Sequence, residues 1–173
     1  EEAGIEEQSA TTKVAVIRQK IGVGNEDKHS KHVYAEPFEG FEISMRVDYP
    51  PPIGEQTLTF NPKSGSFAKD IAPARSFNTF ENIEMAQKLG KVGGGYLHSH
   101  IIMYDGKVIN TELRYPDEFV RHKILDIIGD LYLLGIHIRG RIVANMTSHG
   151  YNQALVQRLY QAVLSTSRSQ DPL

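Results

Sequence analysis

Apolar and polar residues alternate along several stretches in the first half of the chain, and this period of two predicts β-strands. The alternation and the β-branched residues favour strands at 13–23, 32–38, 41–49 and 56–62. The two middle strands are expected to pair with each other around Glu39 and Gly40. The run PPP at 50–52 ends this pairing, because proline has no backbone N–H to donate to a neighbouring strand.

Other stretches follow the helical period or carry helix-ending residues. Helices are expected at 66–74 (a single turn), 78–90, 117–134 and 148–164. Gly90 and Gly135 stop two of them, since glycine readily adopts the left-handed conformation found after many helices.

The second half of the chain also contains strand patterns. Residues 96–104 and 107–110 flank Asp105-Gly106, a turn sequence that predicts a hairpin, and residues 136–147 alternate as a strand. Strands in sequence, with helices interrupting late, indicate an α+β domain. We expect one mainly antiparallel sheet with helices packed on one face.

The composition is that of an ordinary globular protein and excludes several classes of function. Apolar residues make up 40% and charged residues 23%, and the net charge of −2 gives no general attraction to nucleic acid or anionic lipid. The chain has no cysteine, which leaves His, Asp and Glu as its strong metal ligands. No apolar run reaches the roughly 18 residues of a transmembrane segment, and the acidic start EEAGIEEQ does not resemble a signal peptide.

The length of 173 residues suits one domain with a substantial core. We expect this domain at 13–164, with a remnant of a preceding domain or linker at 1–12 and a flexible tail at 165–173. The chain opens on Glu1, and EEAGIEE has the pattern of the end of an element. The polypeptide is therefore expected to be the later part of something longer.

The helix at 117–134 carries the first candidate chemistry. His122, Asp126 and Asp130 follow one another at spacings of four residues and share one face of a helix that is otherwise apolar. The flanking Phe119 and Leu133 indicate that this stripe faces a second packed surface or a cleft. An imidazole and a carboxylate one turn apart suit two ligands of a metal site. The same spacing also occurs by chance on many helices, where such a pair is only hydrogen-bonded or solvent-facing.

His149 lies in TSHGYN, where a strand turns into the last helix. A helix N-terminus disfavours a protonated imidazole, so a proton-donating histidine there needs a carboxylate partner. Asp130, two turns along from His122, is the natural candidate. Two metal ligands at one end and a carboxylate-supported general acid at the other form a set typical of a hydrolase.

The stretch DEFVRHKILDIIGDLYLLG, followed by SHGYNQAL, resembles the UDP-3-O-acyl-N-acetylglucosamine deacetylases. ARSF at 74–77 and LRYPDEF at 113–119 belong to the same pattern. These enzymes catalyse the committed, zinc-dependent step of lipid A biosynthesis, and the match corresponds only to their second domain. The resemblance implies a cytoplasmic hydrolase acting on UDP-3-O-acyl-N-acetylglucosamine, with an inserted β-α-β unit at about 77–102.

The resemblance also implies a role for each residue singled out by spacing. His122 and Asp126 match two of the three zinc ligands. His149 matches the histidine that protonates the departing amine and steadies the oxyanion, and Asp130 the carboxylate that orients and charge-stabilises it. Lys123 matches a lysine that contacts the phosphate of the nucleotide sugar.

Further residues are implied to surround the substrate. Ser76 stands where the family usually has a threonine near the metal and the oxyanion, and it retains the hydroxyl. Candidate residues lining a passage for the acyl chain are Phe77, Ile83, Met85 and Val92, and for each of them an ordinary place in the core is an equally good explanation.

The segment GGGYLHSH at 93–100 departs from the family, which usually has Gly-Gly-Ser there. Tyr96 replaces the small residue and is expected to shorten or reshape the passage. His98 and His100 alternate onto one face of a strand and imitate a metal-binding pair, although structural roles are more common for such histidines.

The third zinc ligand, a histidine, and the glutamate that serves as general base belong to the family's first domain, which no segment here matches. We therefore expect a complementary first domain as a partner, and weak zinc binding and negligible deacetylase activity for this chain alone. Two alternatives remain open. The first alternative to a deacetylase half is a non-catalytic, deacetylase-like binding or assembly module. The second is a metal-dependent amidase for another N-acetylated sugar.

Overall fold

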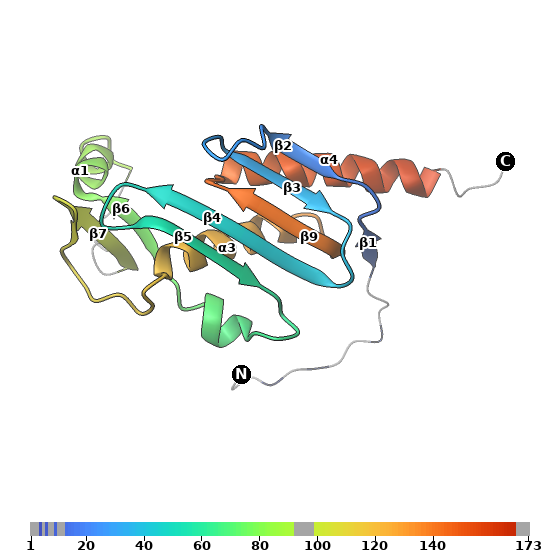
Figure 1. The fold of residues 1–173 in the computed structure, drawn as a ribbon, viewed down its shortest axis with the longest axis horizontal. Helices are drawn as coiled ribbons and strands as arrows, with labels where there is room; N and C mark the ends of the chain where they lie inside the picture. The colour runs from blue at the N-terminus through green and yellow to red at the C-terminus, as the bar shows by residue number, and fades with distance from the viewer. Residues whose placement is uncertain (1–3, 5, 7–8, 10–12, 92–98, 169–173) are drawn as a thin grey trace.

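The structure is a computed structural model that describes residues 4, 6, 9, 13–91 and 99–168. Its larger sheet has six strands in the order β2-β3-β9-β4-β5, with β1 pairing beside β9 (Figure 1). The strands are β1 (Val14–Val16), β2 (Ile21–Gly24), β3 (His32–Glu36), β4 (Phe41–Tyr49), β5 (Gly54–Phe60) and β9 (His137–Asn145). Three pairings are antiparallel, and those of β9 with β1 and β4 are parallel.

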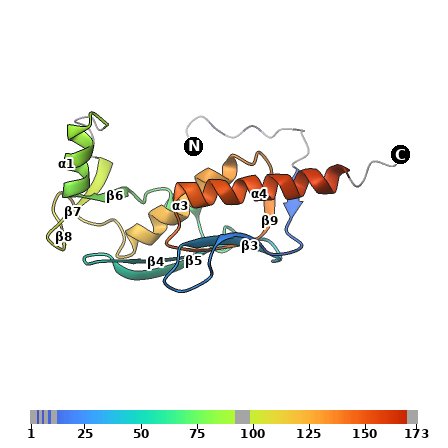
Figure 2. The same ribbon diagram turned by 90° about the horizontal axis from the view of Figure 1, so that it is seen from above.

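Two helices, α3 (Glu118–Tyr132) and α4 (His149–Arg168), lie on one face of this sheet (Figure 2). Alternate residues of β4, such as Ile43, Met45 and Val47, are fully or almost fully buried beneath them. The helices contribute apolar residues that are nearly fully buried, including Ile124 and Leu155. The predicted α+β fold with helices on one face of the sheet is therefore confirmed.

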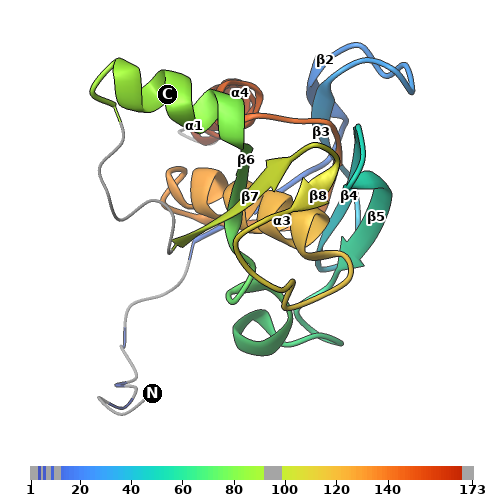
Figure 3. The same ribbon diagram turned by 90° about the vertical axis from the view of Figure 1, so that its left-hand side faces the viewer.

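A smaller sheet lies at one end of the molecule, on the left in Figure 2 and toward the viewer in Figure 3. It contains β6 (Ser76–Thr79), β7 (His100–Tyr104) and β8 (Lys107–Val108), and the helix α1 (Phe80–Lys88) follows β6. Because β6 and β7 run parallel, the unit has the β-α-β form that was predicted. A single π-helical turn, η1 (Phe67–Ile71), precedes it at the place of the expected helical turn.

Local signals of the sequence account for the ends of these elements. Thr79 caps α1 by accepting a hydrogen bond from the N–H of Asn82. Asp105 and Gly106 both have positive φ angles, 47° and 66°, as a two-residue hairpin turn requires. They join β7 to β8 in the predicted antiparallel hairpin.

The pairing predicted between β3 and β4 is wrong. The strand β9 lies between them, antiparallel to β3 and parallel to β4. The connection from β3 to β4 therefore crosses the start of β9, where the N–H of Gly140 donates to the carbonyl of Gly40 at 2.8 Å. A Cβ at position 140 would lie 3.0 Å from the carbonyl oxygen of Glu36, so glycine permits the crossing.

The single strand predicted at 13–23 is also wrong, because the chain forms two strands there. β1 pairs with the first residues of β9, from His137 to Arg139, whereas β2 pairs with β3. The last helix continues to Arg168 instead of ending at 164. Val92, Tyr96 and His98 lie outside the described residues, as do 169–173.

Candidate active site at the junction of helices α3 and α4

The predicted stripe of α3 lies against the first turn of α4. His149 is the first residue of α4, and its imidazole contacts two carboxylates of α3. The approach to α4 is a tight turn in which Met146 has a φ of 50° and donates its backbone N–H to the carbonyl of Arg46. This turn directs the chain from the end of β9 back over α3.

Asp130 supports His149 directly. Nδ1 of His149 lies 2.8 Å from Oδ2 of Asp130, and the side-chain amide of Asn152 donates to the same oxygen, also at 2.8 Å. The hydroxyl of Thr147 donates to the amide oxygen of Asn152 at 2.7 Å. Because a carboxylate only accepts, Nδ1 of His149 carries the hydrogen and its Nε2 is turned toward Asp126. The ring is 63% exposed while its carboxylate partner is buried.

His122 and Asp126 form the second half of the site. Nδ1 of His122 contacts the carbonyl oxygen of Ala74 at 3.2 Å, and Nε2 lies 3.3 Å from Oδ1 of Asp126. A carbonyl oxygen only accepts, so Nδ1 of His122 carries a hydrogen and Nε2 faces another acceptor. A metal ion bound between Nε2 and Oδ1 would satisfy both atoms.

The pair also has the spacing that a metal would need. Two ligand atoms at about 2.0–2.1 Å from a tetrahedral zinc lie about 3.3 Å apart. His122 and Asp126 therefore fit as two neighbouring ligands. Nε2 of His149 lies 3.8 Å from the same Oδ1 of Asp126. Within the described part of the chain, no group of three or more His, Cys, Asp or Glu residues is arranged to hold a metal ion.

Lys123 contacts one of the candidate metal ligands in the structure. Its Nζ donates to Oδ2 of Asp126 at 2.7 Å, and the side chain is largely buried. In this arrangement the ammonium group neutralises the candidate metal ligand and fixes its orientation. The ammonium group has three donors and uses one of them here; its contact with a substrate phosphate stays a prediction.

The segment containing Ser76 runs along His122. Ala74 contacts the imidazole through its carbonyl, and the ring of Phe77 meets it edge-on with centroids 6.0 Å apart. Ser76 lies between these two contact points, at the start of β6. Phe77 also packs edge-on against the buried Phe119 of α3, at 5.0 Å. Phe119, one of the two apolar residues that flank the stripe of His122, Asp126 and Asp130, is thus covered by the β-α-β unit.

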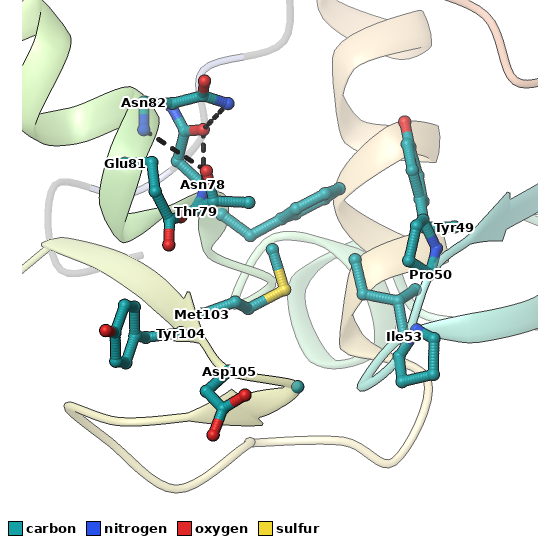
Figure 4. Close-up of a pocket in the computed structure, with 13 residues that line it drawn as sticks. Tyr49, Pro50, Ile53, Asn78, Thr79, Glu81, Asn82, Met103, Tyr104 and Asp105 are labelled. Atoms are coloured by element: carbon teal, nitrogen blue, oxygen red, sulfur yellow. Dashed lines mark hydrogen bonds between the residues drawn. The ribbon is translucent and has the colours of Figure 1, made fainter.

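A cavity of about 290 Å³, lined in part by Phe77, lies between the β4–β5 turn and the β-α-β unit (Figure 4). Its walls include Tyr49, Ile53, Met103 and the side chains of Asn78 and Asn82, which are hydrogen-bonded to each other at 3.0 Å. Apolar walls with a few convergent polar groups are usual for small-molecule sites.

The proposed passage residues lie in different surroundings. Phe77 lines the cavity, whereas Ile83 is buried and Met85 is 61% exposed, and neither lines it. Val92 lies outside the described residues. Nδ1 of His100 is 2.8 Å from the hydroxyl of Ser99, while its supposed partner His98 is not described. The acyl passage and the metal-binding pair of His98 and His100 both stay predictions.

Sequence reasoning missed the residues that support the site. Asn152 and Thr147 are almost fully buried, as is Glu118, one turn before His122. An asparagine in the first turn of a helix and a glutamate in another are usually read as solvent-exposed capping residues. The only available signal was that Glu118 and Asn152 fall on the same helix faces as the site residues.

The fold and the site together define an α+β protein in which two packed helices bring two histidines and two aspartates together. The sequence model of the family described as UDP-3-O-acyl N-acetylglycosamine deacetylase matches residues 1–161, and the chain belongs to this family. None of the helices in the described part of the chain combines the length and the apolar character that a membrane-spanning segment requires.

Curated relatives carry the name UDP-3-O-acyl-N-acetylglucosamine deacetylase. The protein of Hahella chejuensis is 37% identical over 161 residues, which are 91% of this chain and 52% of the relative. The protein of Thioalkalivibrio sulfidiphilus is 38% identical and that of Coxiella burnetii 37%, with the same coverage. The chain thus spans about half the length of the curated relatives that it matches.

Proposed function

We propose that this chain is the second-domain half of a zinc-dependent deacetylase that removes the N-acetyl group of UDP-3-O-acyl-N-acetylglucosamine. The observation that carries the proposal is the convergence at Oδ1 of Asp126, where Nε2 of His122 lies at 3.3 Å and Nε2 of His149 at 3.8 Å. The names of the relatives supply the substrate and the reaction.

His122 and Asp126 would hold the metal. Zinc held by these two residues would supply Lewis-acid chemistry for the amide carbonyl of the substrate and for the attacking water. Ala74 keeps the His122 ring turned so that Nε2 points to the metal position. Lys123 holds the second oxygen of Asp126 and thereby reserves Oδ1 for the metal.

His149 has the geometry of a general acid. Asp130 accepts the hydrogen bond from Nδ1 and stabilises the positive charge of a protonated ring. The remaining proton then stands on Nε2, which faces the same position as the two candidate ligands. From there it protonates the departing amine, and the protonated ring stabilises negative charge on the oxygen of the tetrahedral intermediate.

The family's first domain would complete the site with a histidine ligand and a glutamate base. The end of α3 offers a surface for it, since Tyr132 is 86% and Leu133 70% exposed beside the buried Asp130. Apolar side chains grouped at such a position favour a protein contact. The same proposal places the enzyme in the cytoplasm, in lipid A biosynthesis.

Supplying the missing half tests this proposal. The part of the Hahella chejuensis protein that this chain does not match is co-purified with the chain, and release of acetate from UDP-3-O-acyl-N-acetylglucosamine is measured with zinc. Turnover is expected for the mixture and not for either half. A His149→Ala chain serves as the inactive control.

The result also separates the enzyme from a binding module. A mixture that forms a stable complex and binds zinc at one equivalent, yet releases no acetate, contradicts the proposal and favours a non-catalytic deacetylase-like module. Release of acetate only from other N-acetylated sugars would leave the chemistry in place and overturn the proposed substrate.

A further inference from the structure

Glu118 is a carboxylate sealed inside the protein, one helical turn before His122. Its side chain is 0% exposed. Oε1 accepts the backbone N–H of Arg75 at 3.0 Å and its Nε at 2.9 Å, and Oε2 accepts Nη2 of Arg75 at 3.1 Å and the backbone N–H of Arg114 at 2.6 Å. A buried carboxylate with four donors is held in one orientation.

Arg75 joins this carboxylate to a second segment. Its Nη1 donates to the hydroxyl of Thr111 at 2.8 Å, and its Nη2 to the carbonyl of Glu112 at 2.7 Å. In addition, Nη1 of Arg114 donates to the carbonyl of Pro73 at 2.5 Å. The backbone around residues 73–75 is therefore bound to the start of α3 and to the loop before it by hydrogen bonds on both sides.

This bound backbone is the one that contacts His122. The residue before Arg75 is Ala74, whose carbonyl accepts from Nδ1 of His122. The residue after Arg75 is Ser76, and Phe77 then packs on the same imidazole. A displacement of Arg75 would move the acceptor of His122 and the hydroxyl of Ser76 together.

We propose that Glu118 and Arg75 are positioning residues: their buried ion pair fixes the 74–77 backbone so that the Ala74 carbonyl sets the ring orientation of His122. Stability alone does not require the pair, since replacing a buried ion pair by packed apolar side chains is often neutral or stabilising. What apolar residues cannot do is bind the backbone N–H of Arg75 and of Arg114. The purpose that we assign to the ion pair, positioning a metal ligand, rests on the proposed function. The test of the pair does not, because it requires no deacetylase activity.

The test follows the Nδ1–H proton of His122 in the metal-free, ¹⁵N-labelled chain. Its exchange with water is measured by NMR in the unaltered chain and in Glu118→Gln, Arg75→Lys and Glu42→Gln chains. Glu42 accepts from Arg141 at 2.8 Å and lies on the other face of β4 from Ile43, so its variant is the matched ion-pair control. The backbone amides of Val33 and Ile142, two fully buried residues of paired strands, report global stability in the same spectra.

We expect exchange of the His122 Nδ1–H to be at least about tenfold faster in Glu118→Gln and Arg75→Lys, beyond any acceleration of the core amides, and unchanged in Glu42→Gln. Zinc affinity of the two site variants is expected to fall by about 10–100-fold, as for other residues that orient a metal ligand. Acceleration of the His122 proton and the core amides by one common factor would show a purely structural role and overturn the proposal. Should Glu118→Gln fail to fold, Arg75→Lys decides alone, because it keeps the charge opposite Glu118. None of these measurements depends on deacetylase activity.

Discussion

Nδ1 of His149 lies 2.8 Å from Oδ2 of Asp130, although 19 positions separate them in the chain. The contact links the first residue of α4 to the buried face of α3 and leaves Nε2 of the imidazole exposed toward Asp126. It is the shortest contact between an imidazole and a carboxylate in the described part of the site.

Asp130→Asn tests the charge in this contact. The amide oxygen can still accept from Nδ1, but it no longer stabilises a protonated ring. We expect kcat of the assembled two-half enzyme to fall by about 10²–10⁴-fold, the usual contribution of general acid catalysis, with little change in KM. Glu36→Gln, which removes the charge opposite Arg141 on the outer face of the sheet, is the control. Equal activity of the Asp130 variant would contradict the assigned role of His149.

Asn152 and Thr147 are predicted to stabilise Asp130 together, because Thr147 donates to Asn152 and Asn152 donates to Asp130. Asn152→Ala removes a buried donor to Asp130 and leaves the Thr147 hydroxyl without its acceptor, at a cost of about 1–3 kcal/mol. Thr147→Val costs less, because the amide of Asn152 still reaches Asp130. The effects should not add in the double variant, with a coupling of about 0.5–3 kcal/mol in urea unfolding. Additive losses would mean that the hydrogen-bonded chain is not coupled.

Glu118 gives the folded state a defined dependence on pH. Burial raises the pKa of Glu118, but the hydrogen bonds and charge of Arg75, with the backbone N–H of Arg114, outweigh it and hold that pKa below its ordinary value. A carboxyl whose pKa is lower in the folded state stabilises that state above its unfolded pKa and loses this contribution as the pH falls through the folded pKa.

The Glu118→Gln chain should therefore differ most from the unaltered chain near neutral pH. The difference in the free energy of unfolding between the two is expected to shrink on acidification below the ordinary glutamate pKa. Urea unfolding from pH 7 to pH 3 measures it. A difference that grows toward low pH would show that the carboxyl is destabilising when ionised.

The sequence predicted the helices and the grouping of His122, Asp126 and Asp130, because helical periodicity is local. It also predicted that His149 would meet Asp130, since a proton-donating imidazole at a helix start needs a carboxylate. The position of β9 between β3 and β4 was missed, because strand alternation states which residues are buried and not which strands are neighbours. Glu118 and Asn152 were missed for a related reason: each is buried against a partner from a distant segment, Arg75 for Glu118 and Asp130 for Asn152.

Alanine substitutions at Gly140 and Gly129 are expected to change the free energy of unfolding in opposite directions. An added Cβ at Gly140 would lie 2.6 Å from Cγ1 of Ile17 and 2.9 Å from its Cβ, so Gly140→Ala must displace a buried side chain next to the backbone crossing. We expect a loss of about 1–3 kcal/mol, the usual cost of overpacking.

An added Cβ at Gly129 in α3 meets nothing within 4 Å, and the backbone there is helical. Gly129→Ala should therefore stabilise this chain by about 0.5–1 kcal/mol, because alanine loses less backbone entropy in a helix. Urea unfolding of the two variants side by side gives both values. Equal destabilisation by Gly140→Ala and Gly129→Ala would mean that the face of α3 at Gly129 is covered in solution. Copies of the chain would then associate through the end of α3, the surface that the first domain is proposed to bind.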